Sequence, residues 1–276
     1  MSNLVKKWPA LCLFVLALIL GLAPTLPAAA GLIPLGFMQL GALSASLAGI
    51  ILAAIEGRKG GVKELLRRAL IWRVGLGWWL FVLFFPALLS VVTLYVAPLF
   101  GAPRVDWSAL PPITDLLMML LMLTIFAGLG EEFGWRGFAL PRLQNRYSAL
   151  VSGLIVGVLW WLWHIPLFLI EGVGQYTMAQ EVGFLPAFLG YGLFVVSSAV
   201  TYACLLNNAR GSVLLVAVYH ASMNAWTVYT GAWEHPSRMY TSFALSALVS
   251  IAAVLLFGAK NLSLKHDRDV LAPEQV

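Results

Sequence analysis

Charged residues are scarce in this sequence. Only 11% of the 276 residues are charged, whereas 61% are hydrophobic, and the mean hydropathy is +0.89. A soluble domain of this length does not need so much apolar surface. Hydrophobic runs long enough to cross a bilayer recur along the whole chain. The composition therefore excludes a soluble globular protein and predicts an all-α fold, a polytopic bundle of membrane helices.

Cysteine is equally scarce. Cys12 and Cys204 both lie within apolar runs, and no CxxC spacing occurs. This excludes a disulfide framework and a thiolate zinc site, and we interpret both residues as small buried hydrophobic side chains. Polar linkers and internal repeats are missing as well, so we expect residues 1–276 to form a single membrane domain.

The hydrophobic runs predict about eight membrane spans. They are expected at residues 9–30, 32–55, 70–100, 113–140, 148–170, 183–206, 212–232 and 239–260. An even number of spans places both termini on the same side of the membrane. The first run follows Lys6-Lys7 and ends in small residues, as a secretory signal peptide does. Because it is long and further spans follow, we expect an uncleaved first helix.

Basic residues occur mainly in alternate loops. Thirteen lie in one set of loops and tails, and only Arg104 and Arg238 lie in the opposite set. The thirteen are Lys6, Lys7, Arg58, Lys59, Lys63, Arg67, Arg68, Arg142, Arg146, Arg210, Lys260, Lys265 and Arg268. Loops rich in lysine and arginine stay in the cytoplasm, so we expect a multi-pass protein of the cell membrane with both termini cytoplasmic. Residues 57–69 are expected to begin as a turn and end as a basic interfacial helix.

Several ionisable or strongly polar side chains lie inside the predicted spans. They are Glu131, Glu132, Arg136, His164, His220 and Asn224. A charged group at membrane depth costs roughly 2.5 kcal/mol or more, so it usually marks a functional site. The combination of carboxylates, imidazoles, an amide and a guanidinium is typical of a hydrolytic or proton-handling centre. The alternatives are purely structural roles: an ion pair, a histidine hydrogen-bonded to a neighbouring helix, and an asparagine hydrogen-bonded between helices.

The spacing of these residues assigns them different tasks. Glu132 and Arg136 are four apart, as are His220 and Asn224, so each pair shares one helix face. Burial makes a Glu132–Arg136 ion pair nearly obligatory, and we assign this pair to orientation and charge balance. Adjacent residues on a helix diverge by roughly 100°, which leaves Glu131 to face the reactive centre. The glycines between residues 128 and 137 are expected to permit close helix packing.

Three motifs in order resemble a known family. EEFGWRG at 131–137 resembles the EExxxRG signature of the CAAX-protease and bacteriocin-processing family of intramembrane proteases. WWLWH at 160–164 resembles its second motif, and HASMN at 220–224 resembles its third, HxxxN. The resemblance covers roughly residues 113–230. One position departs from the pattern, because Trp160 stands where the family usually has phenylalanine. We interpret this as a conservative difference that can change the shape of the substrate cleft.

The resemblance implies a role for each residue of the motifs. Glu131 would be the catalytic glutamate and would act with His164 on a water molecule. His220 and Asn224 would complete the site and stabilise the oxyanion. Glu132 and Arg136 would hold the first motif in shape. In a metal-dependent version, a divalent ion such as zinc would be held by Glu131, His164 and His220, and the sequence leaves the metal-free and metal-dependent versions open.

The resulting hypothesis is an intramembrane endopeptidase. Its substrates would be membrane-associated peptides or proteins, of the prenylated or bacteriocin type, and its partners would include the lipid bilayer but no nucleic acid. We expect its cleft to open to the cytoplasmic leaflet, because Glu131 lies nearest the cytoplasmic end of its span. Two alternatives stay open: a non-catalytic membrane scaffold or chaperone, and a proton-coupled transporter, which lacks support from broken helices or repeats.

Overall fold

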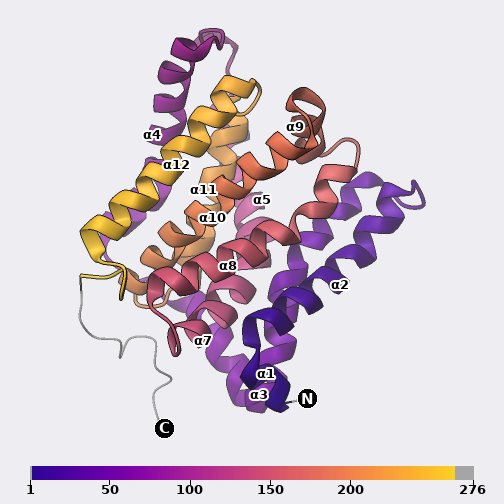
Figure 1. Ribbon diagram of the computed structural model, residues 1–276, viewed down its shortest axis with the longest axis vertical. Helices are drawn as coiled ribbons and strands as arrows, with labels where there is room; N and C mark the ends of the chain where they lie inside the picture. Colours follow the sequence, from indigo (N-terminus) through magenta and orange to yellow (C-terminus); the bar gives the residue numbers. More distant parts are fainter. Residues whose placement is uncertain (1, 265–276) are drawn as a thin grey trace.

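Helices make up all the regular structure in the part of the chain that the computed structural model describes, residues 2–264 (Figure 1). The α-helices are α1 (Ser2–Lys7), α2 (Pro9–Ala29), α3 (Ser44–Arg67), α4 (Leu76–Val96), α5 (Ile113–Leu123), α6 (Gly130–Glu132), α7 (Leu140–Gln144), α8 (Ala149–Trp163), α9 (Gly174–Val182), α10 (Phe184–Asn208), α11 (Val213–Tyr229) and α12 (Pro236–Phe257). The predicted all-α fold is confirmed. Lys265 and Arg268 of the basic set lie outside the described residues.

Seven helical segments among residues 2–264 are long and apolar enough to cross a membrane. They are Pro9–Ala29, Leu35–Gly57, Leu76–Phe100, Ile113–Gln144, Ala149–Leu169, Phe184–Asn208 and Pro236–Phe257. The remaining predicted span corresponds to α11, whose 17 residues reach about 26 Å, the lower end of the length that crosses a bilayer. It packs against α4 and α5. The fold is therefore a polytopic helical bundle, in which seven described segments, against about eight predicted, are long and apolar enough to cross a membrane.

Loops that carry the basic residues meet at one end of the bundle, called the basic end below. The Arg146 guanidinium donates to the backbone carbonyls of Lys6 and Lys7. The backbone N–H of Ala149 donates to the carbonyl of Lys260 at 2.8 Å. Figure 1 shows α1, α3 and α7 together at the lower end of the molecule. The alternate-loop pattern of the sequence is thus a real segregation of charge in space.

The opposite end of the bundle, called the far end below, gathers the loops with few basic residues. Ser237 donates its hydroxyl to the carbonyl of Phe100 at 2.7 Å, and Tyr229 donates to the carbonyl of Pro111 at 2.9 Å. Arg238, one of the two basic residues here, is buried and donates to the carbonyl of Pro103 at 2.9 Å. Helix α9 lies at this end, at the top of Figure 1.

Residues 57–69 turn sharply at the basic end. A Cβ placed on Gly61 would lie 2.6 Å from the carbonyl oxygen of Ala53. In a straight helix, eight residues separate these positions by about 12 Å along the axis. The chain therefore bends back on itself here although α3 extends to Arg67, and glycines are a usual cause of such bends. The structure therefore has a bend within α3 where the sequence predicted a turn followed by a separate helix.

The glutamate-rich span is not a regular α-helix. π-helical stretches, Thr124–Leu129 and Phe133–Ala139, flank the short helix α6 that carries the two glutamates. The regular period assumed from the sequence therefore does not hold, and such wide turns are frequent at functional sites. Close packing holds the segment in place: a Cβ on Gly128 would lie 2.5 Å from the Ala217 carbonyl oxygen of α11.

Candidate functional site

One cavity of about 390 Å³ brings together the four residues predicted to form the polar site. Glu131 comes from α6, His164 follows the last residue of α8, and His220 and Asn224 come from α11. All four line the cavity. Glu131, His164 and His220 are only 5%, 6% and 4% exposed. Segments up to 93 residues apart in the sequence thus converge as predicted, whereas the catalytic roles of these residues stay predictions.

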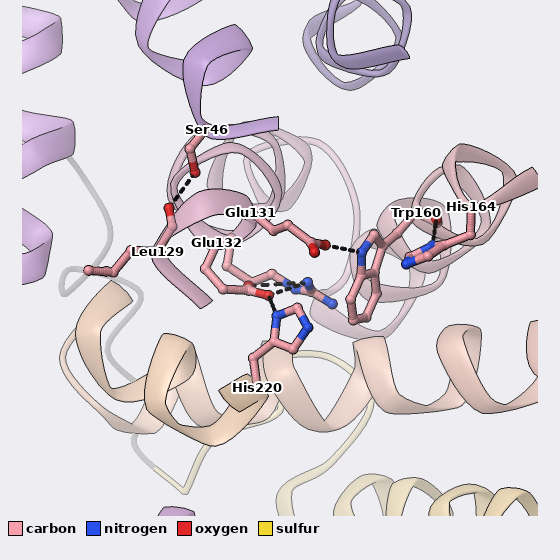
Figure 2. Close-up of polar contacts among 8 residues, drawn as sticks. Ser46, Leu129, Glu131, Glu132, Trp160, His164 and His220 are labelled. Carbon is pink, nitrogen blue, oxygen red and sulfur yellow. Dashed lines mark hydrogen bonds and ion pairs between the residues drawn. The ribbon is translucent and has the colours of Figure 1, made fainter. Parts of the chain in front are cut away.

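Glu131 is held by a tryptophan. Its Oε2 accepts a hydrogen bond from Nε1 of Trp160 at 2.7 Å (Figure 2). An N–H donor to a carboxylate is a charge-assisted bond, which is stronger than a neutral one. Glu131 therefore faces the cavity in a defined orientation. The sequence predicted that Glu131 would point away from the ion pair, but it did not predict this partner.

Glu132 forms the predicted ion pair and also contacts a histidine. Nη1 of Arg136 donates to both of its carboxylate oxygens at 3.0 and 3.1 Å, and both side chains are fully buried. His220 places its Nδ1 2.9 Å from Oε1 of Glu132. A carboxylate that accepts a hydrogen bond from a histidine fixes the orientation of the ring. Glu132 therefore couples the ion pair of the first motif to the histidine of the third.

Two aromatic rings enclose the guanidinium of Arg136. Its central carbon lies 4.2 Å from the ring centroid of Trp160 and 4.4 Å from that of Tyr202. Its Nε and Nη2 have no hydrogen-bond partner among the described residues, so cation–π contact replaces part of the lost hydration. The sequence analysis did not identify Tyr202 as part of the site. A tyrosine hydroxyl in the apolar helix α10 was the feature that could have indicated it.

His164 lies where α8 ends. Its backbone N–H bonds to the carbonyl of Trp161 at 3.0 Å instead of that of Trp160. This tighter turn leaves the Trp160 carbonyl to the ring, whose Nδ1 lies 2.7 Å away. Because a carbonyl oxygen can only accept, Nδ1 must carry the proton. The neutral ring therefore presents Nε2 as an acceptor, and Pro166, which cannot continue the α-helix, follows two residues later.

The side chain of Trp160 contacts several residues of the polar site at once. Its ring centroid lies 5.7 Å from that of His164 and 5.4 Å from that of His220. One side chain thus contacts both histidines, stacks on Arg136 and donates to Glu131. A phenylalanine at this position would keep the ring contacts but would have no N–H to donate. Tryptophan at this position therefore adds a hydrogen bond to the site, whereas the sequence had suggested only a conservative difference that can change the shape of the cleft.

The proposed metal ligands do not form a metal-binding group. Among residues 2–264, no three histidine, cysteine, aspartate or glutamate side chains are placed so that they could hold an ion. Zinc sites require three or four ligands converging at about 2 Å. The present arrangement of Glu131, His164 and His220 does not fit that requirement.

Helices outside the three motifs also line the cavity. Gly21 and Thr25 of α2, and Gln39 between α2 and α3, form part of its wall. The first spans carried no signature in the sequence, so no role in the site could be assigned to them. The first spans therefore help to shape the space around the polar residues.

Comparison with known proteins supports the resemblance seen in the motifs. Residues 113–226 match the model of a family described as type II CAAX prenyl endopeptidase Rce1-like. A curated protein of Methanococcus maripaludis named CAAX prenyl protease 2 is 33% identical over 116 residues, which make up 40% of this chain and 40% of that protein. The match thus spans less than half of either chain. The family-model match, at residues 113–226, includes the segment that carries all three motifs, and the recognised resemblance is confirmed there.

Proposed function

We propose that this multi-pass membrane protein, which resembles type II CAAX prenyl endopeptidases over residues 113–226, is an intramembrane endopeptidase. The observation that carries the proposal is the convergence of Glu131, His164, His220 and Asn224 on one buried cavity within the bundle. Its substrates would be membrane-associated peptides, of the prenylated or bacteriocin type. The decisive experiment compares peptide termini in membranes that contain the wild type or Glu131→Gln.

The proposed reaction begins with water activated by Glu131. The carboxylate accepts a proton from water while Nε2 of His164 accepts a second hydrogen bond and orients the molecule. The hydroxide adds to the carbonyl carbon of the scissile peptide bond and forms a tetrahedral intermediate. The C–N bond then breaks, and Glu131 returns the proton to the leaving amine. Trp160 supports this cycle because its N–H fixes the carboxylate without taking up the transferred proton.

The negative charge that develops on the carbonyl oxygen needs hydrogen-bond donors. Asn224 lines the cavity one turn after His220 on the same helix, and its amide can supply two N–H donors. His220 supplies a further donor when its Nε2 carries a proton, because Nδ1 is already directed to Glu132. Donors arranged in advance in a buried site stabilise such an oxyanion far more than water does.

Trp160→Phe is expected to lower kcat about tenfold or more. The change removes the N–H that holds Glu131 but keeps an aromatic ring beside Arg136, and a hydrogen bond to a charged group contributes about 1.5–3 kcal/mol. Trp161→Phe is the matched control, because the Trp161 indole donates to the carbonyl of Phe188 at 3.0 Å and does not line the cavity. Equal activity of the two variants would contradict the positioning role of Trp160.

Removal of divalent metal is expected to leave peptide cleavage unchanged. The reason is that the described residues lack a group of three side chains able to hold an ion. The measurement is peptide hydrolysis by the purified protein after incubation with a strong chelator, with and without added zinc. Loss of activity with chelator and its recovery with zinc would establish the metal-dependent version instead.

A further inference from the structure

We infer that the proposed active site opens toward the far end of the bundle and receives its substrate from outside the cytoplasm. The substrate would then be an exported, membrane-associated peptide with an apolar segment, rather than a lipid-modified tail of a cytoplasmic protein. The choice of substrate rests on the proposed endopeptidase function. The direction of the opening rests on the arrangement of the cavity and can be tested without any cleavage.

The exposed part of the cavity wall lies at the far end. Its exposed lining residues include Gln39 in the connection between α2 and α3, Gly174 at the start of α9, and Val228 near the end of α11. Trp233, in the loop between α11 and α12, also lines the cavity. Each of these positions borders a loop of the far end. The cavity therefore runs from the buried Glu131 toward these loops.

The protein is closed between Glu131 and the basic end. Every residue from 130 to 141 is buried, and Trp135, Arg136 and Phe138 are among the largest fully buried side chains. Close-packed interiors leave few voids larger than a water molecule. A peptide could not reach Glu131 from the basic end without unpacking this segment. The approach from the far end needs no such change.

The distribution of lysine and arginine residues between the two ends of the bundle indicates which end faces the cytoplasm. Eleven of the thirteen basic residues in the predicted cytoplasmic set belong to the described chain, and contacts such as Arg146 with Lys6 join their loops at the basic end. Among residues 2–264, the far end has only Arg104 and Arg238 as basic residues. The positive-inside rule places the basic end in the cytoplasm. The opening then faces outward, opposite to the direction expected from the position of Glu131 in its span.

The apolar side chains that line the cavity favour the binding of an apolar segment of the substrate. Apart from the polar site, it is lined by Leu22, Met38, Met178 and Val195, among other apolar side chains. Flexible methionines adapt to ligands of irregular shape. A hydrophobic stretch of a peptide in the outer leaflet could enter this space and bring its backbone to Glu131. Membrane-associated exported peptides have this chemistry.

The direction of the opening is tested by cysteine labelling in cells. Cys12 and Cys204 are first replaced by alanine, and single cysteines are introduced by Gly174→Cys and Asn145→Cys. Gly174 has room for a Cβ, and Asn145 is exposed at the basic end. A membrane-impermeant maleimide should label Gly174→Cys in intact cells and Asn145→Cys only after the membrane is opened. The reverse pattern, or no labelling of Gly174→Cys, would overturn the inference.

The side of the substrate is tested with a hydrophobic membrane peptide fused to a reporter on either side of the membrane. Cleavage of the exported fusion by the wild type but not by Glu131→Gln is the expected result. Cleavage of the cytoplasmic fusion alone would overturn the substrate assignment. Cleavage of neither fusion, with Gly174→Cys labelled from outside, would count against the proposed function and leave the outward opening established.

Discussion

Glu131→Gln is expected to reduce peptide-bond hydrolysis by about 10³-fold or more, while the protein accumulates at the wild-type level. Glutamine has nearly the same shape, and its carbonyl oxygen can still accept the hydrogen bond of Trp160. It cannot take a proton from water at neutral pH, and general acid–base catalysis contributes typically 10²–10⁴-fold. Loss of its electrostatic role adds to this effect. The change therefore separates the chemistry from the fold.

The measurement compares peptide termini in host membranes that contain the wild type or Glu131→Gln at matched protein levels. New termini that occur only with the wild type would establish proteolysis and identify the substrate and its cleavage position. Thr93→Val is a suitable control, because Thr93 is buried in α4 and its hydroxyl donates to the carbonyl of Leu89 in the same helix. Identical termini in all membranes, with the same host phenotype, would favour the scaffold hypothesis.

Arg136→Leu is expected to destabilise the protein by about 3–5 kcal/mol, because it leaves a buried carboxylate without its main partner. Glu132 is 0% exposed and would keep only the contact with His220. The stacking of the guanidinium between Trp160 and Tyr202 would also be lost. The measurement is thermal unfolding of the purified protein in detergent. In cells, the folded amount should fall accordingly.

Arg142→Leu provides the matched control for Arg136→Leu. Arg142 also forms an ion pair, with Glu56, but the two side chains are 28% and 21% exposed. Pairs that remain in contact with water contribute about 0–1 kcal/mol, so the loss of stability should be clearly smaller. The double change Glu132→Gln with Arg136→Leu should recover part of the stability, because no buried charge is left. Equal destabilisation by Arg136→Leu and Arg142→Leu would contradict this account.

The two predictions together separate an enzyme from a scaffold. If the protein is an enzyme, Glu131→Gln abolishes peptide hydrolysis without lowering the stability of the fold. Arg136→Leu lowers the stability of the fold, and any loss of hydrolysis follows from the loss of folded protein. In a scaffold, the polar cluster serves only the fold, so both changes should act through the amount of folded protein. The neighbouring positions 131 and 132 are therefore expected to behave differently although both are buried glutamates on the same short helix.

Local chemistry in the sequence was enough to predict several features. The helical membrane fold follows from composition, because only helices and closed barrels satisfy the backbone in lipid. The Glu132–Arg136 pair follows from a separation of four residues within one segment, and the structure confirms it. The motifs identified four of the residues that line the cavity, Glu131, His164, His220 and Asn224. These features depend on neighbours in the sequence or on motifs already present in it.

Other features depend on how distant helices pack, and only the tertiary structure decided them. The bond from Trp160 to Glu131 joins residues 29 apart, and the contact of His220 with Glu132 joins residues 88 apart. Both require particular rotations of α6, α8 and α11, which are set by close packing at positions such as Gly128 and not by any local pattern. The direction in which the cavity opens has the same origin, because it depends on which parts of the bundle are closed by side chains from several helices at once.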